Sequence, residues 1–334
     1  MEEKEIKENS KKKLSKKAKI TIALSSVFGA FLIIFICAYF IVGNFFFKFA
    51  LEANLDMTAS SVGDSFVEGI EDMPLPKLMD EWFIEVPKTT KDIKSGGYTL
   101  KAYDIRAEEE THNWVIIIHG YRSCARDMSL YAYKFYEQGF NILMPDLKAH
   151  GQSEGKYIGM GYSDSKDILK WINVIVDADP DAKIVLHGVS MGAATVMFTT
   201  GLDVPNNVVC AIEDCGYTSV YEQFKFVAND VMGLPVSNLL LSAANVFVKT
   251  RMGVSMQEMN TVKALKKSTT PTMFIHGDKD DFVPFSMLDK VYSANKNIEK
   301  EKLVIEGASH GYSATKDEML YFNSVFTFVN KYIN

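Results

Sequence analysis

Residues 188–192, Gly-Val-Ser-Met-Gly, place a serine between an apolar run at 183–186 and a helix-compatible segment at 193–199. A tight strand-to-helix turn lifts Ser190 into the open at the carboxyl end of the strand. Glycines on either side of the serine let the strand and helix backbones approach closely. Because the bare pattern arises by chance in roughly one chain in ten of this length, the chemical partners of the serine must be sought elsewhere in the chain.

A serine becomes a nucleophile when an imidazole takes its proton and a carboxylate holds that imidazole. His310 follows the strand-like run 302–305 and precedes only the final helix, whereas His187 and His276 lie in earlier segments and are interpreted as structural. Three aspartates, at 278, 280 and 281, crowd the loop after the apolar run 272–275. Asp214, at the end of the strand-like run 208–213, is the alternative acid.

An acyl-transfer site also needs two backbone N–H groups directed at the developing oxyanion. The apolar run 114–118 ends in His119-Gly120-Tyr121, which matches an oxyanion turn. We therefore predict that the N–H groups of Tyr121 and Met191 form the oxyanion hole.

Several segments together resemble the motifs of a known enzyme family. They are 114–121, 145–153, 188–192, the loop that contains Asp280, and His310-Gly311. From about residue 82 onward the chain resembles an α/β-hydrolase of the serine hydrolase branch, which includes monoglyceride-lipase-like and serine-aminopeptidase-like enzymes. Segments 44–50 and 213–217 are similar to membrane-anchored bacterial members. The resemblance implies Ser190, Asp280 and His310 as catalytic residues, with Asp280 favoured by the D-x-x-V-P spacing. Lys148 and Ala149 depart from the usual arginine and glycine, which affects the packing of that loop.

The expected fold is an α/β-hydrolase fold, a mostly parallel eight-stranded sheet flanked by helices. Short apolar runs suit buried parallel strands. The predicted strands are 82–87 and 98–106 at an antiparallel edge, then 114–119, 141–146, 183–188, 208–214, 271–276 and 302–306. The predicted helices are 128–138, 163–176 with Ser163 and Asp164 as caps, 191–200, 285–294 and 316–332.

Residues 217–268 form an insertion without strand signal, which we interpret as a helical lid with an apolar underside. Pro235 breaks its apolar run at 231–241, and Ser255 with Glu258 makes a capping box before a predicted helix at 259–265. Its methionines, Met232, Met252, Met256 and Met259, suit an adaptable acyl pocket or equally the core.

Residues 20–42 contain no charged side chain and would extend about 34 Å as a helix, enough to cross a membrane. Lysines crowd residues 1–19, whereas only Lys48 follows closely, so the amino terminus is predicted to be cytoplasmic and the catalytic domain extracytoplasmic. A cleaved signal peptide is the alternative. The predicted organisation is a basic tail at 1–19, a transmembrane helix at 20–42, a juxtamembrane helical segment at 43–80 and a hydrolase domain at 81–334.

A net charge of −6 argues against nucleic acid as a partner. We expect no cofactor, no metal and no obligate protein partner, and a small-molecule or lipid-like acyl substrate. The predicted function is a membrane-anchored serine hydrolase that cleaves a carboxylic ester with an apolar acyl part. A peptidase or an acyl transferase would use the same residues, and a non-catalytic surface binding protein is the remaining alternative.

Overall fold

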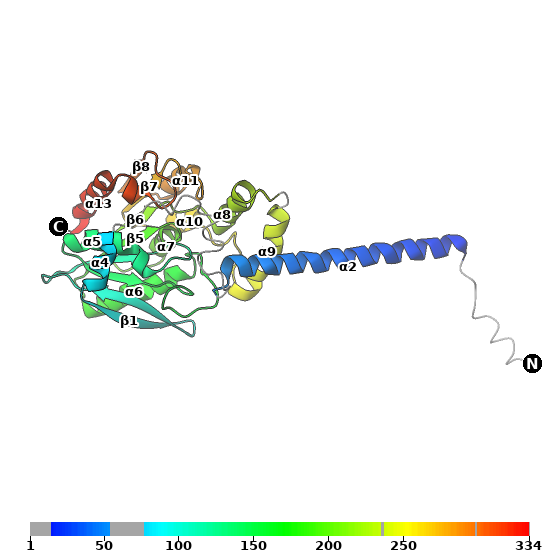
Figure 1. Ribbon diagram of the computed structural model, residues 1–334, viewed down its shortest axis with the longest axis horizontal. Coiled ribbons are helices and arrows are strands. Elements are labelled where there is room, and N and C mark those ends of the chain that lie inside the picture. Colours follow the sequence, from blue (N-terminus) through cyan, green and yellow to red (C-terminus); the bar gives the residue numbers. More distant parts are fainter. Residues whose placement is uncertain (1–14, 54–76, 235–236, 298, 334) are drawn as a thin grey trace, which may run out of the picture.

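Eight strands form one sheet at the centre of the computed structural model, which describes residues 15–53, 77–234, 237–297 and 299–333 (Figure 1). Their order is β1-β2-β4-β3-β5-β6-β7-β8. The first two strands pair antiparallel, β2 pairs antiparallel with β4, and all later pairs are parallel. The strands are β1 (Lys88–Ser95), β2 (Tyr98–Ile105), β3 (Asn113–Ile118), β4 (Asn141–Pro145), β5 (Lys183–Val189), β6 (Val208–Asp214), β7 (Thr272–Gly277) and β8 (Lys300–Ile305). This is the predicted fold class.

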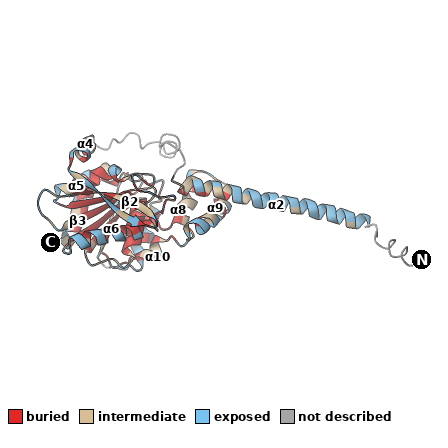
Figure 2. Ribbon diagram, turned by 90° about the horizontal axis from the view of Figure 1, so that it is seen from below, coloured by how far each residue is buried: buried red, intermediate tan, exposed pale blue. Residues whose placement is uncertain are grey.

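Each face of the sheet buries alternate residues of its strands, because successive side chains point to opposite faces. In β3, Ile116 belongs to one core and Ile117 to the other. Figure 2 shows the buried strands enclosed by helices that are exposed on their outer sides. The first core includes residues of α6 (Asp164–Ala178), α7 (Met191–Thr200) and α11 (Ser286–Ala294), and the second includes residues of α5 (Ser129–Glu137) and α13 (Glu318–Ile333).

The edge of the sheet differs from the sequence prediction. The predicted strand at 82–87 is wrong, because helix α4 (Lys77–Glu85) occupies this segment and buries Met79 and Phe83, four residues apart. The true edge strand, β1, escaped prediction because most of its residues are exposed or half-buried and polar. An edge strand that is solvated on both faces lacks the apolar pattern on which strand prediction depends.

The insertion between β6 and β7 is helical in the part that the structure describes. It contains α8 (Val220–Phe226), a π-helical turn η2 (Val227–Val231), α9 (Ser237–Met252) and α10 (Thr261–Leu265). Met256 and Met259 are buried in the first core, whereas Met232 and Met252 are half-buried. Pro235 lies outside the described residues.

Two predicted caps are wrong in detail. Ser255 and Glu258 do bond to each other, as a capping box requires, but they close a turn. The helix α10 starts later, at Thr261, where the side chain of Asn260 accepts the N–H of Lys263. Ser163 precedes α6 without making a side-chain capping bond.

Helix α2 (Lys16–Leu51) is the long apolar element at the amino-terminal side, and it is long and apolar enough to span a membrane. It continues past residue 42, so the predicted span and the start of the juxtamembrane segment are one helix. Residues 1–14 of the basic tail and 54–76 of the juxtamembrane segment lie outside the described residues. The buried positions of α2 are Gly43, Phe47 and Leu51, which lie on one face near its end.

The last turns of α2 are bonded into the domain that holds the sheet. The hydroxyl of Tyr121 donates to the carbonyl of Ala50 at 2.7 Å, and the N–H of Ile158 donates to the carbonyl of Leu51 at 2.8 Å. The ring of Phe47 packs against Tyr157 with centroids 5.1 Å apart. The end of α2 is therefore part of the domain core, and the helix projects from it (Figure 1).

Replacing the buried ring of Phe47 tests this docking. Phe47→Ala is expected to lower the free energy of unfolding by about 3–5 kcal/mol, because it opens a cavity in the first core. Phe45→Ala, at a position of the same helix that is 60% exposed, is the matched control and is expected to change stability little. Thermal unfolding of the full chain in detergent micelles measures both, and equal effects of the two substitutions would contradict the docking.

Candidate active site

The elbow places Ser190 between the end of β5 and the start of α7. Its backbone has φ 58° and ψ −115°, a left-handed conformation that only a constrained turn imposes on serine. A Cβ on Gly188 would lie 2.3 Å from the carbonyl oxygen of Gly192, and a Cβ on Gly192 would lie 2.0 Å from that of Ile118. Glycines are therefore required here by close backbone contact with the turn itself and with the end of β3.

His310 connects Ser190, 120 residues before it, to Asp280, 30 residues before it, through loops at one edge of the sheet. The Nε2 atom of His310 lies 2.8 Å from Oγ of Ser190, and its Nδ1 lies 2.8 Å from Oδ2 of Asp280. The three side chains predicted from the sequence are thus joined in one chain of hydrogen bonds. Since Asp280 accepts the hydrogen on Nδ1 of His310, the Nε2 atom of the same ring has a free lone pair. The hydroxyl of Ser190 donates to that lone pair.

The carboxylate of Asp280 is buried and fully surrounded by donors. Its Oδ1 accepts the N–H groups of Phe282 at 3.0 Å and Val283 at 2.8 Å. Burial opposes its charge, but hydrogen bonds and attraction from His276 and His310 hold its pKa well below the usual range. The group therefore remains a carboxylate that accepts from His310 at neutral pH.

His276 contacts the same oxygen of Asp280 as His310 does, a role that the sequence analysis did not assign. Its Nε2 lies 3.0 Å from Oδ2 of Asp280 and 3.0 Å from the carbonyl oxygen of Val283. Burial alone would lower the pKa of His276, but its hydrogen bond to Asp280 and the nearby acids outweigh burial and raise it. Glu213 is completely buried and accepts the N–H of Gly216 at 3.0 Å, and burial raises its pKa to about 8. The two residues are four positions apart in the sequence, a spacing that permits this contact but does not specify it.

The alternative acid, Asp214, has a different partner. It is completely buried and accepts the hydroxyl of Ser313 at 3.0 Å, and burial raises its pKa. Of the other loop aspartates, Asp278 accepts the N–H of Gly307 at 2.6 Å, and Asp281 is exposed. Among these aspartates, Asp280 lies within hydrogen-bond distance of His310.

The predicted oxyanion turn, His119-Gly120-Tyr121, lies directly beside the elbow, because a Cβ on Gly120 would lie 3.7 Å from the Cβ of Ser190. Two buried histidines hold this turn. Nε2 of His119 accepts the N–H of Leu147 at 3.0 Å, and Nε2 of His150 accepts the N–H of Arg122 at 3.1 Å. Each ring directs Nδ1 at a carbonyl oxygen, so both are neutral and carry their proton on Nδ1.

The turn at 145–153 supplies these contacts. Asp146 accepts the N–H groups of Ala125 and Gln152, at 2.8 and 2.9 Å. Lys148, which replaces the family's arginine, pairs with the buried Asp167 at 3.0 Å. Ala149 adopts φ 66° at the position where glycine is usual. The departure from the pattern of the resembling hydrolases is therefore accommodated by the backbone of the loop and by Asp167 of α6.

One group of side chains has the spacing of metal ligands: Cys215, Asp280 and His310 offer atoms within 4.8 Å of one another. Burial raises the pKa of the Cys215 thiol well above its ordinary value, so it is protonated rather than a thiolate ligand. Asp280 and His310 are already bonded to each other. The chemistry of this donor set therefore fits a hydrogen-bonded pair better than a metal site.

Comparison with known proteins extends these observations. A family model described as serine aminopeptidase, S33, matches residues 109–245. The Bacillus subtilis (strain 168) protein YqkD is 30% identical over 252 residues, which are 75% of this chain and 82% of YqkD. The chain belongs to the serine aminopeptidase S33 family of α/β-hydrolases. The YfhR protein of Escherichia coli O157:H7 is 25% identical over 201 residues, 59% of this chain and 63% of YfhR.

Solved structures share the fold of this S33 family member. The Pyrococcus furiosus esterase Pf2001 matches with a TM-score of 0.61 and 22% identity, over 78% of this chain and 96% of the esterase. The acylaminoacyl peptidase of Pyrococcus horikoshii matches with a TM-score of 0.55 and 16% identity, over 75% of this chain and 43% of the peptidase. Fold and family together make the protein a serine hydrolase.

The neutral histidines beside the oxyanion turn predict a pH dependence of stability. Burial lowers the pKa of His119 and of His150 to about 4, whereas an unfolded histidine titrates near 6.5. Between these values the unfolded chain binds more protons, so the free energy of unfolding falls as the pH falls from about 6.5 to 4. His150→Gln leaves an acceptor for Arg122 that does not titrate, and is expected to reduce this loss by about 2–3 kcal/mol.

Chemical unfolding of the S33 hydrolase at pH 7 and pH 4.5 measures the difference. Parallel pH profiles for the variant and the wild type would show that His150 is not held neutral in the folded protein.

Proposed function

We propose that the protein is a membrane-anchored serine hydrolase that cleaves a carboxylic ester with an apolar acyl part. The single observation that carries this proposal is the bonded chain from Ser190 through His310 to Asp280. Membership of the S33 family supports the hydrolytic chemistry.

In the proposed reaction, Oγ of Ser190 attacks the ester carbonyl carbon while Nε2 of His310 takes the hydroxyl proton. Asp280 holds the ring with its proton on Nδ1 and stabilises the imidazolium that forms. The backbone N–H groups of Tyr121 and Met191 stabilise the oxyanion. His310 then protonates the leaving alcohol, and the same residues activate a water molecule that releases the acid from the acyl-enzyme.

Apolar surroundings favour an ester with an apolar acyl part over a charged substrate. The ring of Phe282 lies 5.0 Å from the ring of His310, and Met191 and Val189 are buried beside the serine. Peptidase and acyl transferase activities use the same triad, and the Pyrococcus horikoshii relative in fold is an acylaminoacyl peptidase. The match to the esterase Pf2001 covers a larger share of both chains than the match to the peptidase does. This comparison favours an ester as the substrate.

We also propose that α2 is an uncleaved anchor, with the amino terminus in the cytoplasm and the catalytic domain outside. Its side chains from 20 to 42 are nearly all exposed and apolar, so the helix is not a buried core helix. Lysines precede the apolar stretch and only Lys48 follows it within the helix, which is the asymmetry of a cytoplasmic amino terminus. Residues 217–268 remain proposed as a lid.

Covalent labelling tests the nucleophile. Wild type is expected to react with a fluorophosphonate probe and to hydrolyse p-nitrophenyl esters faster than aminoacyl anilides. Ser190→Ala should abolish labelling and lower kcat by at least about 10⁴-fold, because Ser190 carries the hydroxyl that bonds to Nε2 of His310 in the described part of the chain. Ser309→Ala, in the exposed loop beside His310, is the matched control. A labelled Ser190→Ala variant would disprove the assignment, and a folded wild type that does not label would favour a binding protein.

The acid is tested by comparing two asparagine variants. Asp280→Asn is expected to lower kcat by about 10⁴-fold, because an amide permits the wrong histidine tautomer. Asp214→Asn is expected to retain most activity, since Asp214 bonds to Ser313 instead. Steady-state turnover of the two variants on one ester decides between them, and the opposite order would make Asp214 the acid.

A further inference from the structure

Helices α2 and α9, far apart in sequence, cross where the anchor leaves the hydrolase domain (Figure 1). A Cβ on Gly43 would lie 2.6 Å from the backbone of Ala243, so the two helices meet at backbone contact. The hydroxyl of Tyr39 bonds to that of Ser242 at 2.9 Å, and Phe40 packs edge-on against Phe247. The lid insertion is thus fixed to the anchor.

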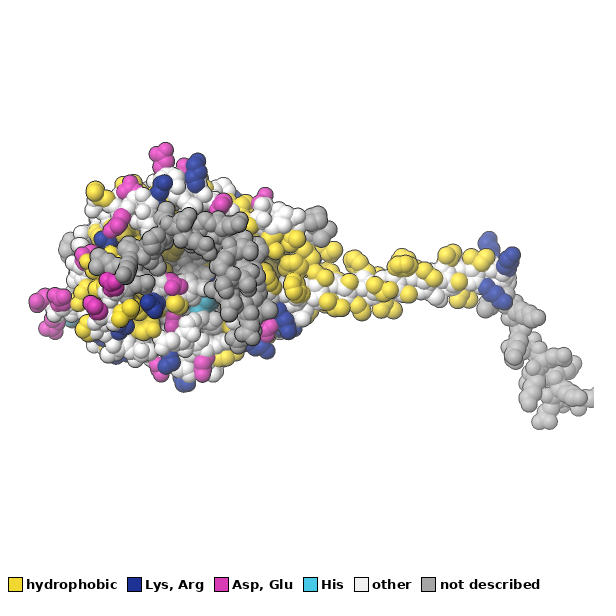
Figure 3. All heavy atoms as spheres, in the orientation of Figure 1, with side chains coloured by type: hydrophobic (Ala, Val, Ile, Leu, Met, Phe, Trp, Pro, Cys, Tyr) yellow, Lys and Arg dark blue, Asp and Glu magenta, His cyan; other side chains and the backbone are white. Residues whose placement is uncertain are grey.

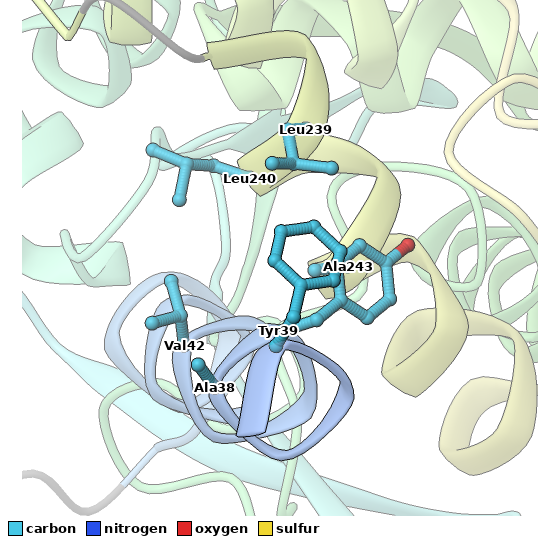
Figure 4. Close-up of a pocket in the computed structure, with 7 residues that line it drawn as sticks. Ala38, Tyr39, Val42, Leu239, Leu240 and Ala243 are labelled. Carbon is cyan, nitrogen blue, oxygen red and sulfur yellow. The ribbon is translucent and has the colours of Figure 1, made fainter. Parts of the chain in front are cut away.

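A groove of about 140 Å³ lies beside this crossing. Figure 4 shows Leu239 and Leu240 of α9 facing Ala38, Tyr39 and Val42 of α2 across it. Apart from the Tyr39 hydroxyl, which is bonded to Ser242, its lining side chains are hydrocarbon. The lining residues are Phe35, Ala38, Tyr39, Val42, Leu239, Leu240 and Ala243.

The groove belongs to a continuous exposed apolar surface. On α2, Phe31, Phe35 and Ile41 are 68%, 56% and 69% exposed. On α9, Leu239 is 44% exposed and Val246 is 37% exposed. Figure 3 shows apolar side chains running from the projecting helix onto the adjoining end of the domain. An apolar surface that extends from a membrane-spanning helix onto its neighbour is suited to hydrocarbon rather than water.

Basic side chains follow the apolar surface at the end nearer the domain. Lys48, Lys249 and Arg251 are exposed. Arg251 donates to the side chain of Asn44 at 2.6 Å and lies over the ring of Phe47, 4.8 Å from its centroid. Between Val42, which lines the groove, and Lys48 the helix rises by about 9 Å. Along α2 toward the domain, the apolar groove therefore comes first and the basic side chains come next. Acyl chains and phosphates follow each other in the same order from the centre of a bilayer to its surface.

We propose that α9 is immersed in the outer leaflet beside α2, with an acyl chain of a bilayer phospholipid in the groove. Lys48, Lys249 and Arg251 then lie at the level of the lipid phosphates. This inference rests on the proposed function, because it requires α2 to span the membrane. It adds that the lid itself is a lipid-contacting element.

The consequence for the active site follows from the end of α2. Tyr121 of the oxyanion turn bonds to Ala50, and the guanidinium of the next residue, Arg122, donates to the carbonyl of Phe49 at 2.6 Å. Residues 49–50 lie about two turns beyond the groove on the same helix. The oxyanion turn is therefore held close to the membrane surface, where substrates with apolar acyl chains concentrate.

Fluorescence quenching by brominated lipid tests the proposal. The full chain carrying Leu239→Trp is placed in phosphatidylcholine–phosphatidylglycerol vesicles whose acyl chains are brominated, and the signal of the three native tryptophans is subtracted with wild type. Phe31→Trp reports the span itself. Leu320→Trp is the matched control, because Leu320 is 43% exposed on α13, at the end of the domain away from α2 (Figure 1). An unchanged thermal unfolding midpoint verifies that each variant is folded.

We expect at least twofold quenching, by about the same factor at positions 239 and 31, and none at 320. Quenching at 31 without quenching at 239 would overturn this proposal and leave the anchor intact. Absence of quenching at both positions would overturn the anchor as well. Quenching at position 239 that is absent at a high ratio of protein to lipid and appears only when lipid dilutes the protein would assign the groove to a second copy of the chain. That result would also overturn the proposal.

Discussion

The hydrogen bond between His310 and the ionised Asp280 is the interaction on which the site depends. A buried carboxylate without donors would take up a proton and lose its ability to orient the imidazole. Here two backbone N–H groups and His276 satisfy the remaining positions of Asp280. The surrounding protein thus keeps the negative charge in place, and the charge in turn leaves Nε2 of His310 free to face Ser190.

The fold provides this arrangement by aligning the carboxyl ends of parallel strands. Ser190 follows β5, Asp280 follows β7 and His310 follows β8, while the oxyanion turn follows the adjacent β3. Parallel strands end at the same edge, so loops from distant parts of the chain meet there. Helix α2 adds a further constraint, because Ala50 in its last turn bonds to Tyr121 of the oxyanion turn and Tyr39 bonds to Ser242 of helix α9. One helix therefore contacts both the candidate site and the proposed membrane surface.

Much of this could be predicted because each site residue follows closely on a strand, and the runs that form β3, β5 and β7 are mostly apolar and buried. The misread segment at 82–87 shows the limit, since a short aromatic run is compatible with both a strand and a helix until its neighbours are known. The contact between His276 and Asp280 depends on how the intervening loop turns back, which residue spacing does not specify. The docking of Phe47 and the crossing of α2 with α9 depend on residues that are distant in the sequence. The partners of Phe47, Tyr157 and Phe247, lie roughly 110 and 200 positions further along the chain.

A crystal structure after reaction with a phosphonate ester tests the central claim most directly, because the adduct resembles the tetrahedral intermediate. The account predicts a covalent bond from phosphorus to Oγ of Ser190. It also predicts a phosphonyl oxygen about 2.7–3.1 Å from the backbone nitrogens of Tyr121 and Met191, with His310 still bonded to Asp280. Phosphorus on another residue, or a phosphonyl oxygen directed away from both nitrogens, would contradict it.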